Sequence, residues 1–230
     1  MSSDHNIGTL NEGSLHSALK RLYMQSGDQL EVDLDGFVID IVRGLGRPDE
    51  LLIEIQTASF GALAQKLDRL LGDHRILLVH PIAETTLLER PGQKMRRSPK
   101  SGSIFALFDE LVSLPTMLDH PNLELEVVLV SMVKSQAHDP RARRGRGGWR
   151  TIDRRIDEVV ETRRFSSVED LVALIPPGIV EPFTTEDIAV AAQIKRDVAQ
   201  RVAYCLRHAG RLEQIARTQA GISYVWSARG

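Results

Sequence analysis

Three polar side chains stand on two otherwise apolar segments of FVIDIVRGLGRPDELLIEIQ. Asp40 lies in the first segment, and Glu54 and Gln56 lie in the second. Alternate side chains of a β-strand share a face, so a hairpin of these segments would bring the three together. Burying two carboxylates without a counter-charge costs several kcal/mol or more. Because Mg²⁺ binds one or two carboxylates and can activate water beside a phosphate, the pattern indicates metal-dependent phosphate chemistry.

The surrounding sequence predicts the elements that must position these side chains. Apolar residues at helical spacing, from Leu15 to Tyr23, predict a helix that Asn11 can cap, which places Glu12 in its first turn. Three strands, a second helix and a buried strand are then expected over residues 30–34, 37–42, 51–56, 60–71 and 76–79. This order is typical of a mixed α/β domain.

This combination of a helix acid, an aspartate and a Glu-x-Gln pair resembles the PD-(D/E)XK nucleases, which have the restriction-endonuclease-like fold. The core of that fold is a helix, three antiparallel strands, a helix and a strand, and residues 10–82 fit it. The resemblance implies that Asp40 and Glu54 ligate Mg²⁺ or Mn²⁺, with Glu12 as an additional acid. It also implies that Gln56 occupies the position usually held by lysine.

The sequence departs from the family pattern at two positions. Ile39 stands where the motif has proline, which is often absent. Gln56 cannot be a cation, and in some members the lysine moves to the following helix. Lys66, at the border of the apolar face of helix 60–71, is then the candidate that stabilises phosphate charge. The alternative interpretations are that Glu12 merely favours a helix N-terminus, that Lys66 is solvated, and that the two strand acids face solvent.

The middle of the chain contains two basic stretches. A loop, a helix and a strand are expected over residues 91–102, 104–114 and 123–132, and a charged helix over residues 151–162. Between them, DPRARRGRGGWR is a second candidate nucleic-acid surface through Arg143, Arg144 and Arg146. Trp149 could stack on a base there. The alternative is an exposed flexible loop that binds nothing.

The C-terminal part predicts three helices and a hairpin. Helices are expected over residues 168–175, after a cap at Thr184 or Thr185, and over residues 195–208, with strands over residues 212–218 and 222–227. This order is typical of a winged helix-turn-helix, whose third helix enters the major groove of DNA. The polar residues outside its apolar stripe are candidate DNA contacts, namely Lys195, Arg196, Gln200, Arg201 and Arg207. The alternative is a small helical domain with a solvated charged face.

The sequence therefore predicts an α/β fold in two domains. Residues 1–164 would form a restriction-endonuclease-like mixed central sheet flanked by helices, and residues 165–230 a small winged-helix domain.

Composition limits the class of protein. The 230 residues are 42% hydrophobic and 26% charged, which is ordinary for a globular chain. A net charge of -2 excludes a globally basic coat but permits local basic patches. The single cysteine, Cys205, excludes an intrachain disulfide and a cysteine-based zinc site. No apolar run is long enough to cross a bilayer, and the N-terminus lacks a secretory signal, so we expect a cytoplasmic protein without a membrane partner.

Two functions follow from these patterns. The first is a Mg²⁺- or Mn²⁺-dependent DNA nuclease, endonucleolytic in action, in which Gln56 orients water, Lys66 supports the phosphate and a winged helix positions the DNA. The alternative is a non-catalytic DNA-binding regulator or adaptor on a degenerate nuclease fold, indicated by Gln56 in the lysine position. A homodimer would suit cleavage of both strands, although nothing in the sequence marks an interface. The sequence leaves DNA and RNA equally open as substrates.

Overall fold

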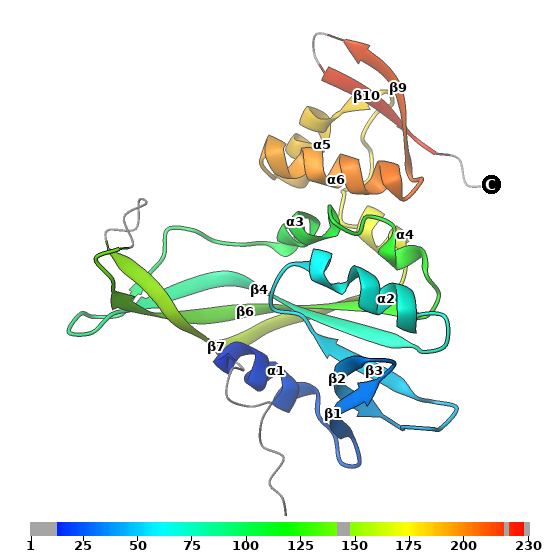
Figure 1. Ribbon diagram of the computed structural model, residues 1–230. Coiled ribbons are helices and arrows are strands. Elements are labelled where there is room, and N and C mark those ends of the chain that lie inside the picture. Colours follow the sequence, from blue (N-terminus) through cyan, green and yellow to red (C-terminus); the bar gives the residue numbers. More distant parts are fainter. Residues whose placement is uncertain (1–12, 142–147, 219–220, 228–230) are drawn as a thin grey trace, which may run out of the picture.

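The computed structural model describes residues 13–141, 148–218 and 221–227. The expected site residues Glu12, Arg143, Arg144 and Arg146 lie outside these ranges. The described chain forms a large mixed sheet with helices on both faces, followed by a smaller unit of helices and short strands (Figure 1). The mixed α/β class expected from the sequence is confirmed.

The large sheet joins the three N-terminal strands to three long ones. Among the described residues its order is β1-β2-β3-β4-β6-β7, and β5 pairs with β4. The strands are β1 (Gln29–Leu34), β2 (Phe37–Arg43), β3 (Leu51–Ile55), β4 (Ile76–Glu89), β5 (Arg96–Arg97), β6 (Leu123–His138) and β7 (Trp149–Phe165). β3–β4 and β4–β6 pair in parallel, and the other pairs are antiparallel. Since β2 and β3 lie inside the sheet, a polar side chain on either strand needs a partner.

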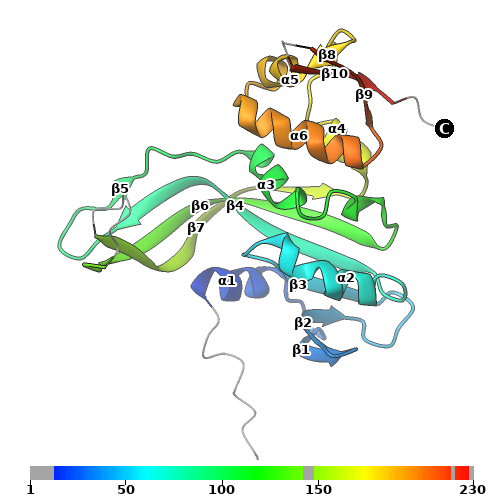
Figure 2. The ribbon, with the colours of Figure 1, turned by 45° about the horizontal axis from the view of Figure 1, so that its top comes forward.

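Helices cover both faces of this sheet (Figure 2). They are α1 (Ser14–Tyr23), α2 (Ala64–Leu70) and α3 (Leu107–Leu111), with 3₁₀ turns η2 (Phe60–Leu63), η3 (Ile104–Ala106) and η4 (Met117–Asp119). Leu19 of α1 packs with Ile41 and Ile53 in one apolar cluster. Leu67 of α2 packs with Val42 and Leu52 in the other, on the opposite face. The hairpin β2–β3 is therefore enclosed between α1 and α2.

The predicted helix over residues 151–162 is wrong, because this segment belongs to β7. β7 pairs with β6 along its whole length, from His138 with Trp149 to Leu125 with Phe165. Its many β-branched residues pack well on a pleated surface. The strand expected over residues 123–132 is confirmed and continues to His138.

The outer strand β7 carries extra residues. Its register against β6 shifts at three places, and Ile152, Asp157 and Val160 have no residue opposite them in β6. A bulge of this kind adds one residue to one strand, bends it and increases its twist. Past Ala83, β4, β6 and β7 continue together as a ribbon that projects from the body of the molecule (Figure 1).

The C-terminal unit packs three helices against a short sheet. Its elements are α4 (Val168–Val172), β8 (Phe183–Thr184), α5 (Thr185–Ala192), α6 (Arg196–His208), β9 (Leu212–Thr218) and β10 (Gly221–Trp226), with strand order β8-β10-β9. The predicted cap is confirmed, since the Thr184 hydroxyl accepts hydrogen bonds from the amides of Glu186 and Asp187. The predicted helices and hairpin are present with small differences in their ends. Across the described ranges, no helix is both long and apolar enough to span a membrane.

Candidate functional site

Asp40 and Glu54 lie where strands β2 and β3 separate. The pairing between β2 and β3 ends, toward these two acids, with Ile41 and Ile53. One step further, the Asp40 carboxylate accepts a hydrogen bond from the amide of Ile55, with 2.8 Å between N and Oδ2. The backbone of β3 thus holds the acid of β2.

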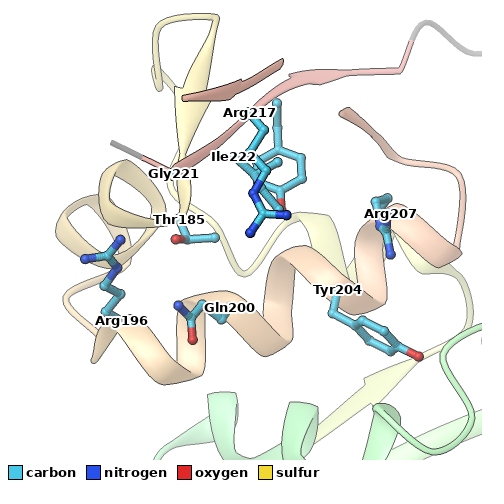
Figure 3. Close-up of a pocket in the computed structure, with 9 residues that line it drawn as sticks. Thr185, Arg196, Gln200, Tyr204, Arg207, Arg217, Gly221 and Ile222 are labelled. Atoms are coloured by element: carbon cyan, nitrogen blue, oxygen red, sulfur yellow. The ribbon is translucent and has the colours of Figure 1, made fainter. Parts of the chain in front are cut away.

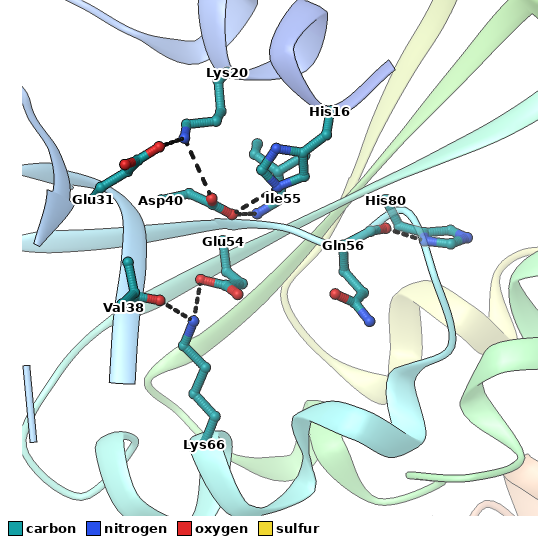
Figure 4. A network of polar contacts seen from close by, with 10 residues as sticks. All are labelled: His16, Lys20, Glu31, Val38, Asp40, Glu54, Ile55, Gln56, Lys66 and His80. Carbon is teal, nitrogen blue, oxygen red and sulfur yellow. Dashed lines mark hydrogen bonds and ion pairs between the residues drawn. The ribbon is translucent and has the colours of Figure 1, made fainter. Parts of the chain in front are cut away.

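Two cationic or ionisable side chains of α1 reach Asp40 (Figure 4). His16 Nε2 lies 3.2 Å from Asp40 Oδ2, and Lys20 Nζ lies 3.7 Å from Oδ1 and 3.0 Å from Glu31 Oε1. Burial opposes ionisation of Asp40. The hydrogen bonds from His16 and from the Ile55 amide, together with the charge of Lys20, outweigh it and hold the pKa of Asp40 below its usual value. Asp40 is therefore an ionised carboxylate at neutral pH.

Glu54 is held from the other face, by α2. Lys66 Nζ lies 2.5 Å from Glu54 Oε2 and donates to the carbonyl of Val38 at 2.7 Å. Burial raises the pKa of Glu54 above its usual value, and the negative charge of Asp40 adds to this, while Lys66 offsets part of the increase. The two acids therefore influence each other electrostatically although different helices hold them.

The sequence prediction that Asp40, Glu54 and Gln56 share one apolar face is wrong. Asp40 contacts α1, Glu54 contacts α2, and the Gln56 amide donates to the carbonyl of Ser59 at 2.7 Å. The side-chain alternation of a regular hairpin does not apply past the point where β2 and β3 separate. Asp40 and Glu54 nevertheless adjoin, which is what the prediction of a paired acid site requires.

The donor set for a cation contains two carboxylates. In the part of the chain that the structure describes, no three His, Cys, Asp or Glu side chains form a group that could hold a metal ion. Asp40 and Glu54 interact electrostatically, and Mg²⁺ takes one or two carboxylates and fills its remaining positions with water. These two carboxylates are therefore the candidate ligands for a hard divalent cation.

The end of β3 is fixed by a buried histidine. His80 Nδ1 lies 2.7 Å from the carbonyl oxygen of Gln56, so this nitrogen carries the proton and donates. The imidazole meets the Phe60 ring edge-on, and the Phe60 amide donates to Glu110 Oε2 at 3.1 Å. Burial lowers the pKa of His80, partly offset by the carbonyl of Gln56 and the charge of Glu110. His80 is therefore a neutral positioning group for this strand end.

Sequence reasoning missed His16, Lys20 and His80. The first two lie four residues apart, which places them on one side of α1. That spacing was available from the sequence, but nothing there indicated that Asp40 lies opposite. His80 carried no signal beyond its place in a buried strand.

A pocket opens beside His16, with a volume of about 270 Å³. His16 of α1, Thr57 after β3, and Thr151 and Arg154 of β7 contribute polar groups to its lining. His16 also contacts Asp40, so this one side chain connects the lining of the pocket to the acid pair.

A larger pocket of about 500 Å³ lies on the C-terminal unit, between α6 and the β9–β10 hairpin (Figure 3). One side is a stripe of α6 residues that are all exposed, namely Arg196, Gln200, Tyr204 and Arg207. Arg217 and Tyr224 of the hairpin form the other side. Three of the predicted DNA contacts therefore share one basic concave surface.

The remaining predicted contacts of α6 lie elsewhere. Arg201 forms ion pairs with Asp109 of α3, at 2.5 Å, and with Asp197, at 3.2 Å. It therefore joins α6 to the large unit instead of lining the pocket. Lys195 is exposed at the N-cap of α6.

Trp149 is engaged within the protein. The Arg90 guanidinium lies 4.4 Å from its ring centroid, and His138 meets the ring edge-on at 5.6 Å. Stacking of a base on the face that Arg90 covers, as the sequence suggested, would require Arg90 to leave.

Comparison with known proteins gives a family. A model described as Domain of unknown function (DUF8091) matches residues 13–166, from the cap of α1 to the end of β7. The chain is also similar to an uncharacterized protein of Treponema pallidum (strain Nichols), with 31% identity over 188 residues that cover 80% of this chain and 73% of that protein. No solved structure matches it. The chain therefore belongs to the DUF8091 family.

Proposed function

We propose that this protein is a Mg²⁺- or Mn²⁺-dependent DNA nuclease of the PD-(D/E)XK type. The observation that carries the proposal is the position of Lys66, whose Nζ lies 2.5 Å from Glu54 beside the coupled carboxylate of Asp40. In a nuclease of this type with Gln56 in place of the strand lysine, a lysine of the following helix is expected to contact the glutamate of the Glu-x-Gln pair.

The order of the N-terminal elements supports this proposal. α1, three antiparallel strands, α2 and the parallel strand β4 follow one another. The acids stand on the second and third of these strands, with a helix on each face. This is the order of the restriction-endonuclease-like core, and it places both acids on neighbouring strands inside the sheet.

The residues have distinct roles in this proposal. Asp40 and Glu54 would hold the cation, which would supply Lewis acidity to the phosphate and activate water. His16 and Lys20 keep Asp40 ionised and fix its orientation. Lys66 neutralises Glu54 and is placed to stabilise charge on a bound phosphate. Glu12 is a proposed additional ligand outside the described residues, and Gln56, in contact with Ser59, would turn to orient water.

The C-terminal unit is proposed to be a winged helix-turn-helix that binds the DNA. The order α4, β8, α5, α6, β9, β10 and the strand order β8-β10-β9 support this assignment. α6 would enter the major groove with Arg196, Gln200 and Arg207, which can contact base edges and phosphates.

Cleavage of plasmid and linear DNA in Mg²⁺, Mn²⁺ or EDTA tests the proposal. Asp40→Asn and Glu54→Gln should each abolish cleavage and leave DNA affinity nearly unchanged. Asp33→Asn changes an exposed acid of the neighbouring strand β1, so it is the matched control and should cleave like the parent. Equal cleavage by parent and site variants would refute the assignment.

A second candidate is a DNA-binding regulator without catalysis. The observation that favours it is Gln56, which lacks a positive charge and donates its amide to Ser59. Calorimetric titration with Mn²⁺ separates the two. The nuclease should bind Mn²⁺ and lose this binding in Asp40→Asn, whereas a regulator need not bind it at all.

A further inference from the structure

Basic residues are concentrated in two short stretches outside the sites described above. Residues 90–102 and 138–150 together hold ten of the 29 Lys and Arg residues of the chain and one of its 31 acidic residues. The whole chain has a net charge of -2, so the rest of the molecule is strongly acidic. A field of one sign on one part of a molecule attracts a partner of the opposite sign.

The fold places the first stretch along the outer part of β4, and it brings the described residues 138–141 and 148–150 of the second stretch to the end of the ribbon. β5 pairs with β4 through Leu88 and Arg96, so the segment between them turns back on itself at the end of β4. Arg90 then links the two stretches, because its Nε donates to Gln136 at 2.9 Å and its guanidinium lies over Trp149. The two stretches are therefore in contact, although they are far apart in the sequence.

Four cations of the first stretch face solvent. Lys94, Arg96, Arg97 and Lys100 are exposed, and none forms an ion pair with an acid in the described part of the chain. By contrast, Arg155 nearby is paired with Glu89 at 2.7 Å. Like charges gathered without counter-charges repel one another, and binding a polyanion relieves that repulsion.

The position of the ribbon indicates which kind of polyanion would bind there. Thr151 and Arg154, toward the outer end of the ribbon, line the pocket beside His16, which contacts Asp40. A nucleic-acid strand that leaves the acid pair through this pocket would meet the ribbon. The seven residues Ala83–Glu89 extend it by about 23 Å at 3.3 Å per residue, close to seven base steps.

The composition of the tip disfavours a membrane. Within RPGQKMRRSPKSG, Met95 is the one large apolar residue, and no aromatic residue is present. Membrane-surface elements combine cations with a buried apolar face.

We propose that the segment Arg90–Gly102, which we name the basic arm, binds the phosphate backbone of nucleic acid. Lys94, Arg96, Arg97 and Lys100 make the contacts, and they read no sequence because phosphates carry none. The path of the nucleic acid from the acid pair to the basic arm rests on the proposed nuclease function, whereas binding to the basic arm does not.

The test compares two triple variants of matched charge. Lys94→Gln/Arg96→Gln/Arg97→Gln changes the basic arm, and Arg21→Gln/Arg47→Gln/Arg75→Gln removes three exposed cations from the body. Binding of a labelled 30-bp duplex is measured by fluorescence anisotropy in EDTA, over a range of salt and with two unrelated sequences. EDTA separates binding from cleavage.

The arm variant should lower the slope of log K against log salt by about three units, close to one per lost phosphate contact, and equally for both sequences. The body variant should leave the slope nearly unchanged. Parent-like duplex binding by the arm variant overturns the proposal. The proposal is also overturned if the parent binds anionic phospholipid vesicles and the arm variant loses that binding while it still binds the duplex. If the parent binds through the arm but never cleaves, the nuclease proposal fails and the arm stands.

Discussion

Lys66 of α2 lies with its Nζ 2.5 Å from Oε2 of Glu54 on β3, and both side chains are mostly buried. The same Nζ donates to the carbonyl of Val38 on β2. One cation therefore connects α2 to both strands of the hairpin at the level of the acid pair. Its removal would leave the Glu54 carboxylate buried without a counter-charge.

We expect Lys66→Met to destabilise the protein by about 3 kcal/mol, because breaking a buried ion pair leaves one charge uncompensated. In a Glu54→Gln background the same change should cost much less. Urea unfolding of the four proteins at pH 7 gives the coupling energy directly. A cost for Lys66→Met that is independent of Glu54 would contradict the pairing.

In the nuclease assay, Lys66→Met should also lower the cleavage rate about 100-fold.

His80 makes stability depend on pH. Its pKa is lowered by burial, so the folded protein resists protonation that the unfolded chain accepts near pH 6.5. The contribution of His80 is fully present above that pH and is lost as pH falls through the lower pKa of the folded state. His80→Asn keeps a donor for the Gln56 carbonyl but does not titrate. The difference in unfolding free energy between parent and variant should change below pH 6.5 by at most about 1.4 kcal/mol per pH unit. A difference that stays constant from pH 7 to pH 5 would contradict this account.

Arg207 and Arg201 lie on the same helix and should behave differently. Arg207 lines the exposed pocket of the C-terminal unit, whereas Arg201 is paired with Asp109 of α3. Arg207→Gln should weaken DNA binding and reduce its salt slope by about one unit. Arg201→Gln should leave the slope unchanged and cost less than about 1 kcal/mol of stability, since the pair is partly exposed. Equal effects of the two variants on binding would argue against the proposed DNA surface.

Cys205 reports on the opening of the C-terminal unit. The side chain is buried, and burial raises the pKa of its thiol to about 12. The thiolate is the reactive form, so native protein at pH 8 should resist alkylation by iodoacetamide. In urea, labelling followed by mass spectrometry should track unfolding of α6. Rapid labelling of native protein would show that the helix opens readily.

Several elements could be predicted because their signals are local. The helix around Leu19, the strands of FVIDIVR and LLIEI, and the cap at Thr184 each follow from periodicity or capping over a few residues. The site was predictable only in part. That Asp40 and Glu54 would adjoin followed from the hairpin, but their contacts with helices on opposite faces depend on where β2 and β3 separate, which no local pattern marks.

The failure over residues 151–162 has a specific cause. Ile152, Ile156, Val159 and Val160 recur at spacings of four, three and one, which imitate a helix. In β7 the extra residues Ile152, Asp157 and Val160 break the two-residue alternation that a regular strand would show. Pairing with β6 decides the conformation of residues 151–162. That pairing joins residues far apart in the sequence, which a pattern over a few neighbouring residues does not reveal.

We expect the same three extra residues of β7 to oppose aggregation at this edge of the sheet. A strand at the border of a sheet presents free amides and carbonyls to any extended chain in solution, and fibrils grow by that route. A chain docking on β7 would find its hydrogen bonds out of phase after a few residues. We expect concentrated samples to remain free of fibrils, and deletions that restore a regular repeat to β7 to turn this border into a template for growth.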